Sequence, residues 1–204
     1  MTLVYGNHSL HTDTSRIELH VSDRLDGGEI SPADGRITIR KEDDGIAWGA
    51  MYWQYFENVE KIASSGMGVS LKRTLYRVES DKRLTPVAPT DLLKVGDKVR
   101  VRLEISSDRT LEYLELKDPR CAAFEPVSTA SGWRWGGAVS YYCSVTNAAQ
   151  TLYIDRLEKG RYIVEYDLYV NNAGTYVTAP TTIQCLYAPE FRALCPAGKV
   201  SVAE

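Results

Sequence analysis

Histidine, phenylalanine and long apolar runs are all scarce in this sequence of 204 residues. Its three histidines, His8, His11 and His20, lie near the amino terminus, so a catalytic triad on the rest of the chain would lack its base. The longest strongly apolar stretch, Ile46–Trp53, is far shorter than the roughly 20 residues that span a bilayer. The sequence therefore predicts neither a Ser-His-Asp hydrolase nor a membrane-spanning helix.

A large excess of charge of one sign is lacking as well. Lys and Arg number 24 and Asp and Glu 27, which gives a net charge of −3, and no block of like charges occurs. Because attraction to phosphates supplies most of the affinity for nucleic acid, we expect no nucleic-acid partner. The amino terminus has neither a cationic start nor an apolar run, so we expect no export signal in this stretch. The chain is then either cytoplasmic or a piece of a longer exported polypeptide.

Motifs that hold metals, nucleotides or redox cofactors are also missing, and we predict no cofactor. The four cysteines form no C-x-x-C pair, so we expect them to be buried or weakly paired, with their disulfide state open. They are Cys121, Cys143, Cys185 and Cys195. His8, His11 and Asp13 have a metal-like spacing, but no helix fixes their geometry, and a mobile polar amino-terminal segment is the simpler interpretation. No G-x-G-x-x-G or P-loop pattern is present.

What the sequence does contain is alternation with a period of two. Lys98–Ile105 and Arg161–Val170 each place apolar residues on one face and charged residues on the other, which predicts antiparallel strands. Shorter strands are predicted at Ile17–Val21, Arg36–Lys41, Val69–Val78, Leu111–Lys117, Ser140–Val145, Thr151–Leu157 and Thr181–Tyr187. Helical periodicity is confined to short turns at Phe56–Ile62 and Thr90–Val95. Many short strands without crossover helices predict an all-β sandwich.

A boundary is predicted near the small-residue stretch Ala63–Gly68, which follows an aromatic strand expected at Ile46–Phe56. The residues after it suffice for a complete sandwich. The first 60 or so residues supply only three or four strands, whereas a complete sandwich has about seven. We therefore expect the first unit to be incomplete, so that the isolated chain either self-associates or buries the unpaired edges of this sheet in some other way.

Two groups of side chains are candidates for a functional role. Glu104, Glu165 and Asp167 lie on the polar faces of their strands, where solvated charge is the default, so no catalytic residue is predicted and the chain is not expected to be an enzyme. A cluster of rings flanks Gly136-Gly137 and is either core packing or an exposed interaction surface. It consists of Trp133, Trp135, Tyr141 and Tyr142.

Three further stretches carry a family resemblance. They are AWGAMYWQYFE at 47–57, VGDKVRVRLE at 95–104 leading to LELKDPR at 114–120, and TIQCLYAPEF at 182–191. Their order and content resemble the C-terminal end of bacterial alpha-2-macroglobulin-like proteins, large envelope-associated chains of Bacteroides-type bacteria. KGRYIVEYDL at 159–168 and AGTY at 173–176 are similar as well.

The resemblance implies an antiparallel macroglobulin-like β-sandwich at 63–204, preceded by the returning strands of a split CUB-like β domain at 1–62. Members of the family trap proteases: cleavage of a bait region triggers a conformational change, and in many members a Cys-Gly-Glu-Gln thioester then captures the protease. No Cys-x-Glu-Gln occurs at any cysteine of this chain and no bait region is identifiable.

The role implied for this chain is therefore that of a non-catalytic C-terminal fragment of a broad-spectrum inhibitor. It would pack beside the thioester and macroglobulin domains of its parent, meet proteases only through that parent, and move on trap closure. The implied location is the periplasm or outer envelope, through a lipoprotein parent. A carbohydrate-binding sandwich that uses exposed Trp and Tyr rings is the alternative, and a sandwich hydrolase with two facing carboxylates ranks last.

Overall fold

The computed structural model describes residues 2–5, 8–11, 23–40, 44, 46, 51, 52, 54, 56–136 and 138–204. The chain forms two compact units, residues 1–55 and residues 56–204. Among these described residues, regular structure consists of strands and three short 3-10 helices, and the predicted all-β class is confirmed. In the part of the chain that is described, no helix is long and apolar enough to cross a membrane.

The first unit contains a small antiparallel sheet. Its strand order is β2 (His8–His11), β1 (Thr2–Tyr5) and β3 (Ile37–Arg40), and the 3-10 helices η1 (Gly27–Glu29) and η2 (Pro32–Gly35) precede β3. The strand predicted at 36–41 is confirmed as β3, whereas the one predicted at 17–21 lies outside the described residues. The prediction of a mobile amino terminus is wrong, because β1 pairs with both β2 and β3.

The aromatic strand predicted at 46–56 is not seen where the chain is described. Ile46, Met51, Tyr52, Gln54 and Phe56 belong to no strand, and the remaining positions lie outside the described residues. Ile46, Tyr52 and Phe56 are almost fully exposed. A strand requires a partner for its backbone groups, and none is found for these five residues in the described part of the chain.

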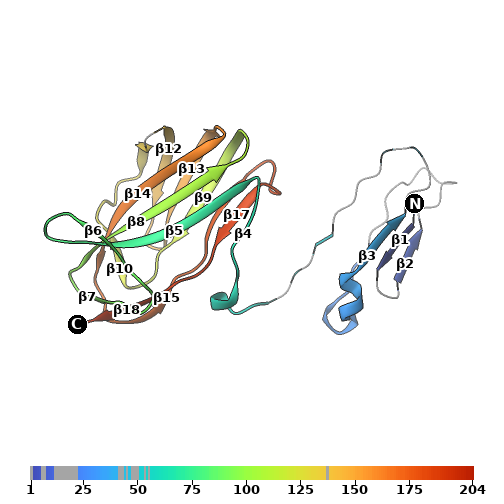
Figure 1. Cartoon of the computed structure of the whole chain (residues 1–204), viewed down its shortest axis with the longest axis horizontal. Helices are drawn as coiled ribbons and strands as arrows, with labels where there is room; N and C mark the ends of the chain where they lie inside the picture. The colour runs from blue at the N-terminus through green and yellow to red at the C-terminus, as the bar shows by residue number, and fades with distance from the viewer. Residues whose placement is uncertain are drawn as a thin grey trace. The chain divides into compact units, whose positions relative to one another are not determined.

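The second unit is a sandwich of two main antiparallel sheets (Figure 1). The five-stranded sheet has the order β10 (Phe124–Pro126), β14 (Gly160–Val170), β8 (Lys98–Ser107), β5 (Val69–Val78) and β6 (Leu84–Pro86). The seven-stranded sheet has the order β11 (Gly132–Gly136), β12 (Val139–Val145), β13 (Ala149–Leu157), β9 (Leu111–Pro119), β16 (Thr181–Cys185), β17 (Arg192–Cys195) and β4 (Ser65–Met67).

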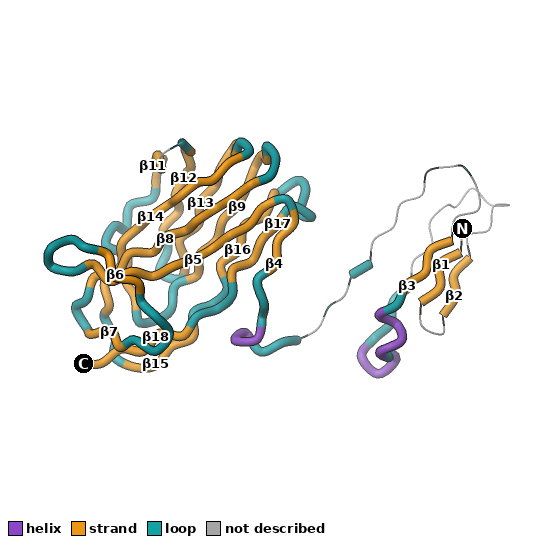
Figure 2. Tube along the Cα trace, in the orientation of Figure 1, coloured by secondary structure: helices purple, strands orange, loops and turns teal. Residues whose placement is uncertain are grey.

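A third, small sheet lies at one end of the sandwich (Figure 2). It has the order β15 (Gly174–Val177), β18 (Lys199–Ala203) and β7 (Leu92–Lys94), and β18 and β7 pair in parallel. The helical turn predicted at 90–95 is therefore wrong, because tertiary pairing with β18 holds these residues extended. The turn predicted at 56–62 is confirmed as the 3-10 helix η3 (Val59–Lys61), in which the Asn58 side chain accepts from the backbone N–H of Glu60.

The core lies between the two main sheets and follows the alternation of the sequence. In β8 the buried residues are Val99, Val101, Leu103 and Ile105. In the facing seven-stranded sheet, the buried residues include Leu114 and Leu116 of β9 and Leu152 and Ile154 of β13. The predicted strands at 98–105, 161–170, 69–78, 111–117, 140–145, 151–157 and 181–187 correspond to β8, β14, β5, β9, β12, β13 and β16.

One residue joins the two sheets at a corner of the sandwich. β4 belongs to the seven-stranded sheet and β5 to the five-stranded sheet, and only Gly68 separates them. Its φ of +70° is in the left-handed region that favours glycine, and an added Cβ would lie 2.7 Å from Cδ1 of Phe191. The chain therefore changes sheet within a single residue.

Candidate interaction surface

Three aromatic side chains form a row across neighbouring strands of the seven-stranded sheet. Trp133 of β11 lies opposite Tyr142 of β12, and Tyr142 lies opposite Tyr153 of β13. All three are exposed, and the rings of Trp133 and Tyr142 meet edge to face with centroids 5.9 Å apart. We call Trp133, Tyr142 and Tyr153 the aromatic row. Trp135, two residues along β11, is 78% exposed and extends the same face.

The fourth residue of the predicted ring cluster, Tyr141, is not part of this surface. It is 5% exposed and belongs to the core, because adjacent residues of a strand point to opposite faces. Burial raises the pKa of its phenol. Tyr153 takes its place on the surface and was missed, although its flanking residues Leu152 and Ile154 indicate by alternation that it points outward. The edge-to-face geometry of Trp133 and Tyr142 is not the coplanar platform that the carbohydrate-binding alternative requires.

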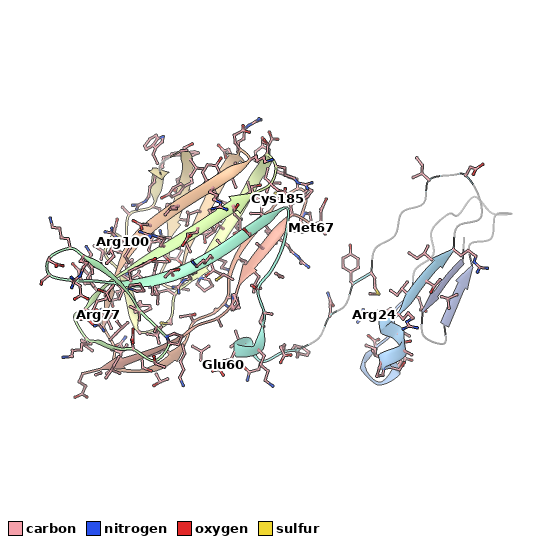
Figure 3. All side chains as sticks on the ribbon, viewed as in Figure 1. Arg24, Glu60, Met67, Arg77, Arg100 and Cys185 are labelled. Carbon is pink, nitrogen blue, oxygen red and sulfur yellow. The ribbon has the colours of Figure 1, made fainter. Side chains whose placement is uncertain are left out.

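Ion pairs cover the outer face of the five-stranded sheet. Arg100 Nε lies 2.7 Å from Asp167 Oδ1, and Lys98 Nζ lies 2.9 Å from Asp167 Oδ2. Arg102 Nε lies 2.6 Å from Glu165 Oε1. The hydrogen bond from Arg100 lowers the pKa of Asp167. Figure 3 labels Arg100 on β8. Of the three carboxylates considered as acids, Glu165 and Asp167 thus neutralise cations across the β8–β14 pair, and Glu104 Oε1 lies 3.7 Å from Lys72 Nζ of β5.

A hollow of about 380 Å³ lies beside these ion pairs. Its lining residues come from both main sheets and from the segment after β10, and they are Arg100, Val127, Ser128, Arg134, Gln150, Glu165, Tyr166 and Asp167. Both carboxylates in the lining are held by the ion pairs just described. Among the described residues, no group of three or more His, Cys, Asp or Glu side chains could hold a metal ion.

A buried polar cluster connects the two sheets at the level of this hollow. Asp118 of β9 is 1% exposed and accepts hydrogen bonds from the Tyr166 hydroxyl and, at 2.6 Å, from Thr181 Oγ1. Arg73 Nε of β5 lies 2.9 Å from Asp118 Oδ1. Desolvation disfavours the Arg73 charge, but the carboxylate outweighs it and raises the Arg73 pKa. Burial, followed by the charge of Asp118, raises the pKa of Tyr166 well above its usual value.

This cluster was not predicted from the sequence, although the sequence contains a signal for it. Asp118 follows Leu114 and Leu116 at the buried phase of β9, and Arg73 follows Val69 and Leu71 at the buried phase of β5. A charged residue at a buried phase requires a partner of opposite charge. Two such residues on different strands therefore predict a buried ion pair.

All four cysteines are free thiols. Cys121, Cys143 and Cys185 are buried, and burial raises the pKa of each thiol. Cys195 is partly exposed.

We expect Ellman's reagent to modify Cys195 of the folded chain well before the other three cysteines, because the reactive species is an accessible thiolate. The measurement is the time course of absorbance in native buffer, followed by the total in urea. The Cys195→Ser variant should lose the fast phase and keep the slow one. A fast phase of unchanged amplitude in that variant would show that a buried thiol is accessible.

The second unit also matches a known family. The profile described as Bacterial Alpha-2-macroglobulin MG10 domain matches residues 68–190. The chain belongs to the bacterial alpha-2-macroglobulin family. This confirms the predicted family, while the Bacteroides type stays a prediction. No curated protein matches the chain.

Solved structures of bacterial alpha-2-macroglobulins show the same fold. A native Escherichia coli structure spanning domain MG7 to the C-terminus is 16% identical with a TM-score of 0.60, and the match covers 71% of this chain and 25% of that one. The Salmonella protein reacted with methylamine is 15% identical with a TM-score of 0.57, and the match covers 70% of this chain and 10% of that one. The Escherichia coli protein activated by porcine elastase is 13% identical with a TM-score of 0.57, and the match covers 69% of this chain and 14% of that one. This chain thus spans a quarter or less of the length of these three proteins.

Proposed function

We propose that this chain is the non-catalytic C-terminal part of an envelope-associated alpha-2-macroglobulin-like protease inhibitor. In the parent molecule it packs beside the thioester domain and shifts when the trap closes. The observation that carries the proposal is the MG10 match over 68–190. Similar solved proteins include Escherichia coli alpha-2-macroglobulins activated by trypsin and by elastase, which supports proteases as the targets of the parent.

The aromatic row is the surface best suited to contact a neighbouring domain. Tyr and Trp are enriched at protein interfaces because they combine a large apolar area with a polar group. The row presents Trp133, Tyr142 and Tyr153 side by side, whereas the outer face of the five-stranded sheet is occupied by ion pairs. The seven-stranded sheet therefore presents the row of neighbouring exposed rings, which the ion-paired face of the five-stranded sheet lacks among its described residues.

The test compares the parent chain with a form that lacks residues 64–204, each titrated with trypsin. We expect the truncated form to trap much less trypsin per mole, measured as protected activity toward a small substrate. Equal trapping by both forms would contradict the proposal.

A surface variant tests the same proposal without deletion. Replacing Trp133 and Tyr153 by serine in the parent should reduce trapping while leaving the melting temperature of the isolated chain nearly unchanged, because both side chains are exposed. Tyr169→Ser is the matched control, since Tyr169 is a similarly exposed ring on β14. Equal trapping by the double variant and the control would argue against domain contact through the row.

A further inference from the structure

One edge of β14 has no strand partner over most of its length in the described part of the chain. On one side β14 pairs with β8 from Gly160 to Tyr169 without a break. On the other side β10 pairs only with residues 168–170, and Val127 N–H then donates to Asp167 C=O before the chain leaves the sheet. Figure 1 shows β14 near the margin of its sheet. Residues 160–166 therefore present an open backbone edge.

The hydrogen bonds around this edge identify which residues face it. The N–H and C=O of Val170 bond to Asp97 and Gly96, on the β8 side. Asp167 C=O and Asn171 N–H bond to Val127 and Ala123, on the β10 side. The N–H and C=O groups of successive residues point alternately to the two sides of a regular strand. The pairing of β14 with β8 keeps one register throughout, so β14 has no bulge there. The odd-numbered residues thus direct their N–H and C=O groups to the open edge.

Within the open segment these residues are Arg161, Ile163 and Glu165. Their side chains share the outer face of the sheet and are all exposed, Ile163 at 52%. Glu165 pairs with Arg102 on the β8 side, whereas Arg161 has no ion pair within the described residues. The segment contains no proline, one of the devices that commonly keep an exposed edge from pairing.

We propose that this edge pairs with the same edge of a second copy of the chain, antiparallel about a two-fold axis at Ile163. Ile163 then lies opposite its counterpart, and Arg161 of each copy lies opposite Glu165 of the other. Each of these pairs exchanges both N–H···O bonds. Cross-strand pairs of opposite charge stabilise a sheet, and here one flanks the axis on each side.

Charge disfavours the registers with the axis at either flanking charged residue. An axis at Arg161 would place two guanidinium groups face to face, and an axis at Glu165 would do the same with two carboxylates. About the axis at Ile163 the sequence Arg-x-Ile-x-Glu is thus self-complementary, which favours a second copy as the partner. A two-fold contact of this kind is isologous and closes as a dimer. Edge pairing alone buries little area, so the dimer belongs to the weak, concentration-dependent class.

Sedimentation equilibrium of the whole chain over a wide concentration range tests the proposal at low salt. The wild type should show reversible dimerisation. Arg161→Glu and Glu165→Arg should each raise the dissociation constant about tenfold or more, because each places like charges opposite one another on both sides of the axis. An equimolar mixture of the two variants should restore dimers, now as heterodimers. Arg83→Glu, at an exposed position in the β5–β6 turn, makes the same charge change elsewhere and should have no effect.

Any of three results would overturn the proposal. The wild type could stay monomeric, dimers could survive in both single variants, or the mixture could fail to form heterodimers. Glu165→Arg also removes the partner of Arg102, so its melting temperature is measured alongside. If it does not fold, Ile163→Lys replaces it. That substitution places two ammonium groups at the axis, on an exposed side chain, and should abolish the dimer without lowering the melting temperature. Wild-type affinity in Ile163→Lys would equally overturn the proposal.

Discussion

Replacing Asp118 by alanine is expected to lower the free energy of unfolding by about 3–5 kcal/mol, the range for removing one partner of a buried ion pair. Asp118 is 1% exposed and satisfies Arg73, Tyr166 and Thr181 from three other strands. Without its carboxylate the guanidinium of Arg73 keeps its charge in a buried site and has no counter-ion within the cluster. Urea unfolding, followed by far-UV circular dichroism, measures the loss.

A double variant separates loss of the pair from loss of volume. Arg73→Met together with Asp118→Leu removes both charges, so it should be destabilised by clearly less than Asp118→Ala alone, because no buried charge is left unpaired. Tyr166→Phe, which removes only one donor to the same carboxylate, should cost about 1.5–3 kcal/mol, the range for a hydrogen bond to a charged group. If the double variant lost as much stability as Asp118→Ala, the interpretation of Asp118 as the counter-ion of Arg73 would be wrong.

The second large effect is expected for Leu103→Ala in β8, at about 2–5 kcal/mol. Leu103 is fully buried in the central strand of the five-stranded sheet, between β14 and β5. Truncation leaves a cavity in a densely packed layer, so the lost transfer energy and the cavity cost add. The measurement is the same urea titration.

Leu92→Ala is the matched control for this truncation. Leu92 lies in β7 and is 56% exposed, so the same chemical change should alter stability by no more than about 0.5 kcal/mol. Similar losses at the two positions would mean that the inward-facing row of β8 does not form the core.

The long strands could be predicted because alternation is a direct result of burying one face of a sheet. β8 and β14 each repeat the pattern over many residues, which leaves a single phase compatible with the sequence. Strands of three residues, such as β4, β6 and β7, repeat too little of the pattern to be seen. Their extended form comes from partners distant in sequence, as in the parallel pairing of β7 with β18.

The candidate surface was only partly predictable for a related reason. Proximity in sequence grouped Tyr141 with Tyr142, although neighbours in a strand point to opposite faces. The aromatic row is instead assembled by strand register, which places Tyr153 opposite Tyr142. The pairing of β12 with β13, and not the local composition, therefore decides which rings share a face.

The corner at Gly68 determines how mechanical tension would enter the sandwich. A pull on the chain ahead of Ser65 acts first on β4, which is held to β17 by a pairing of only three residues at the edge of its sheet. Beyond Gly68 the same pull meets β5, which pairs with β8 from Val69 to Arg77. A short strand that can be peeled away thus precedes a long one that resists, so β4 would detach before the rest of the sandwich yields.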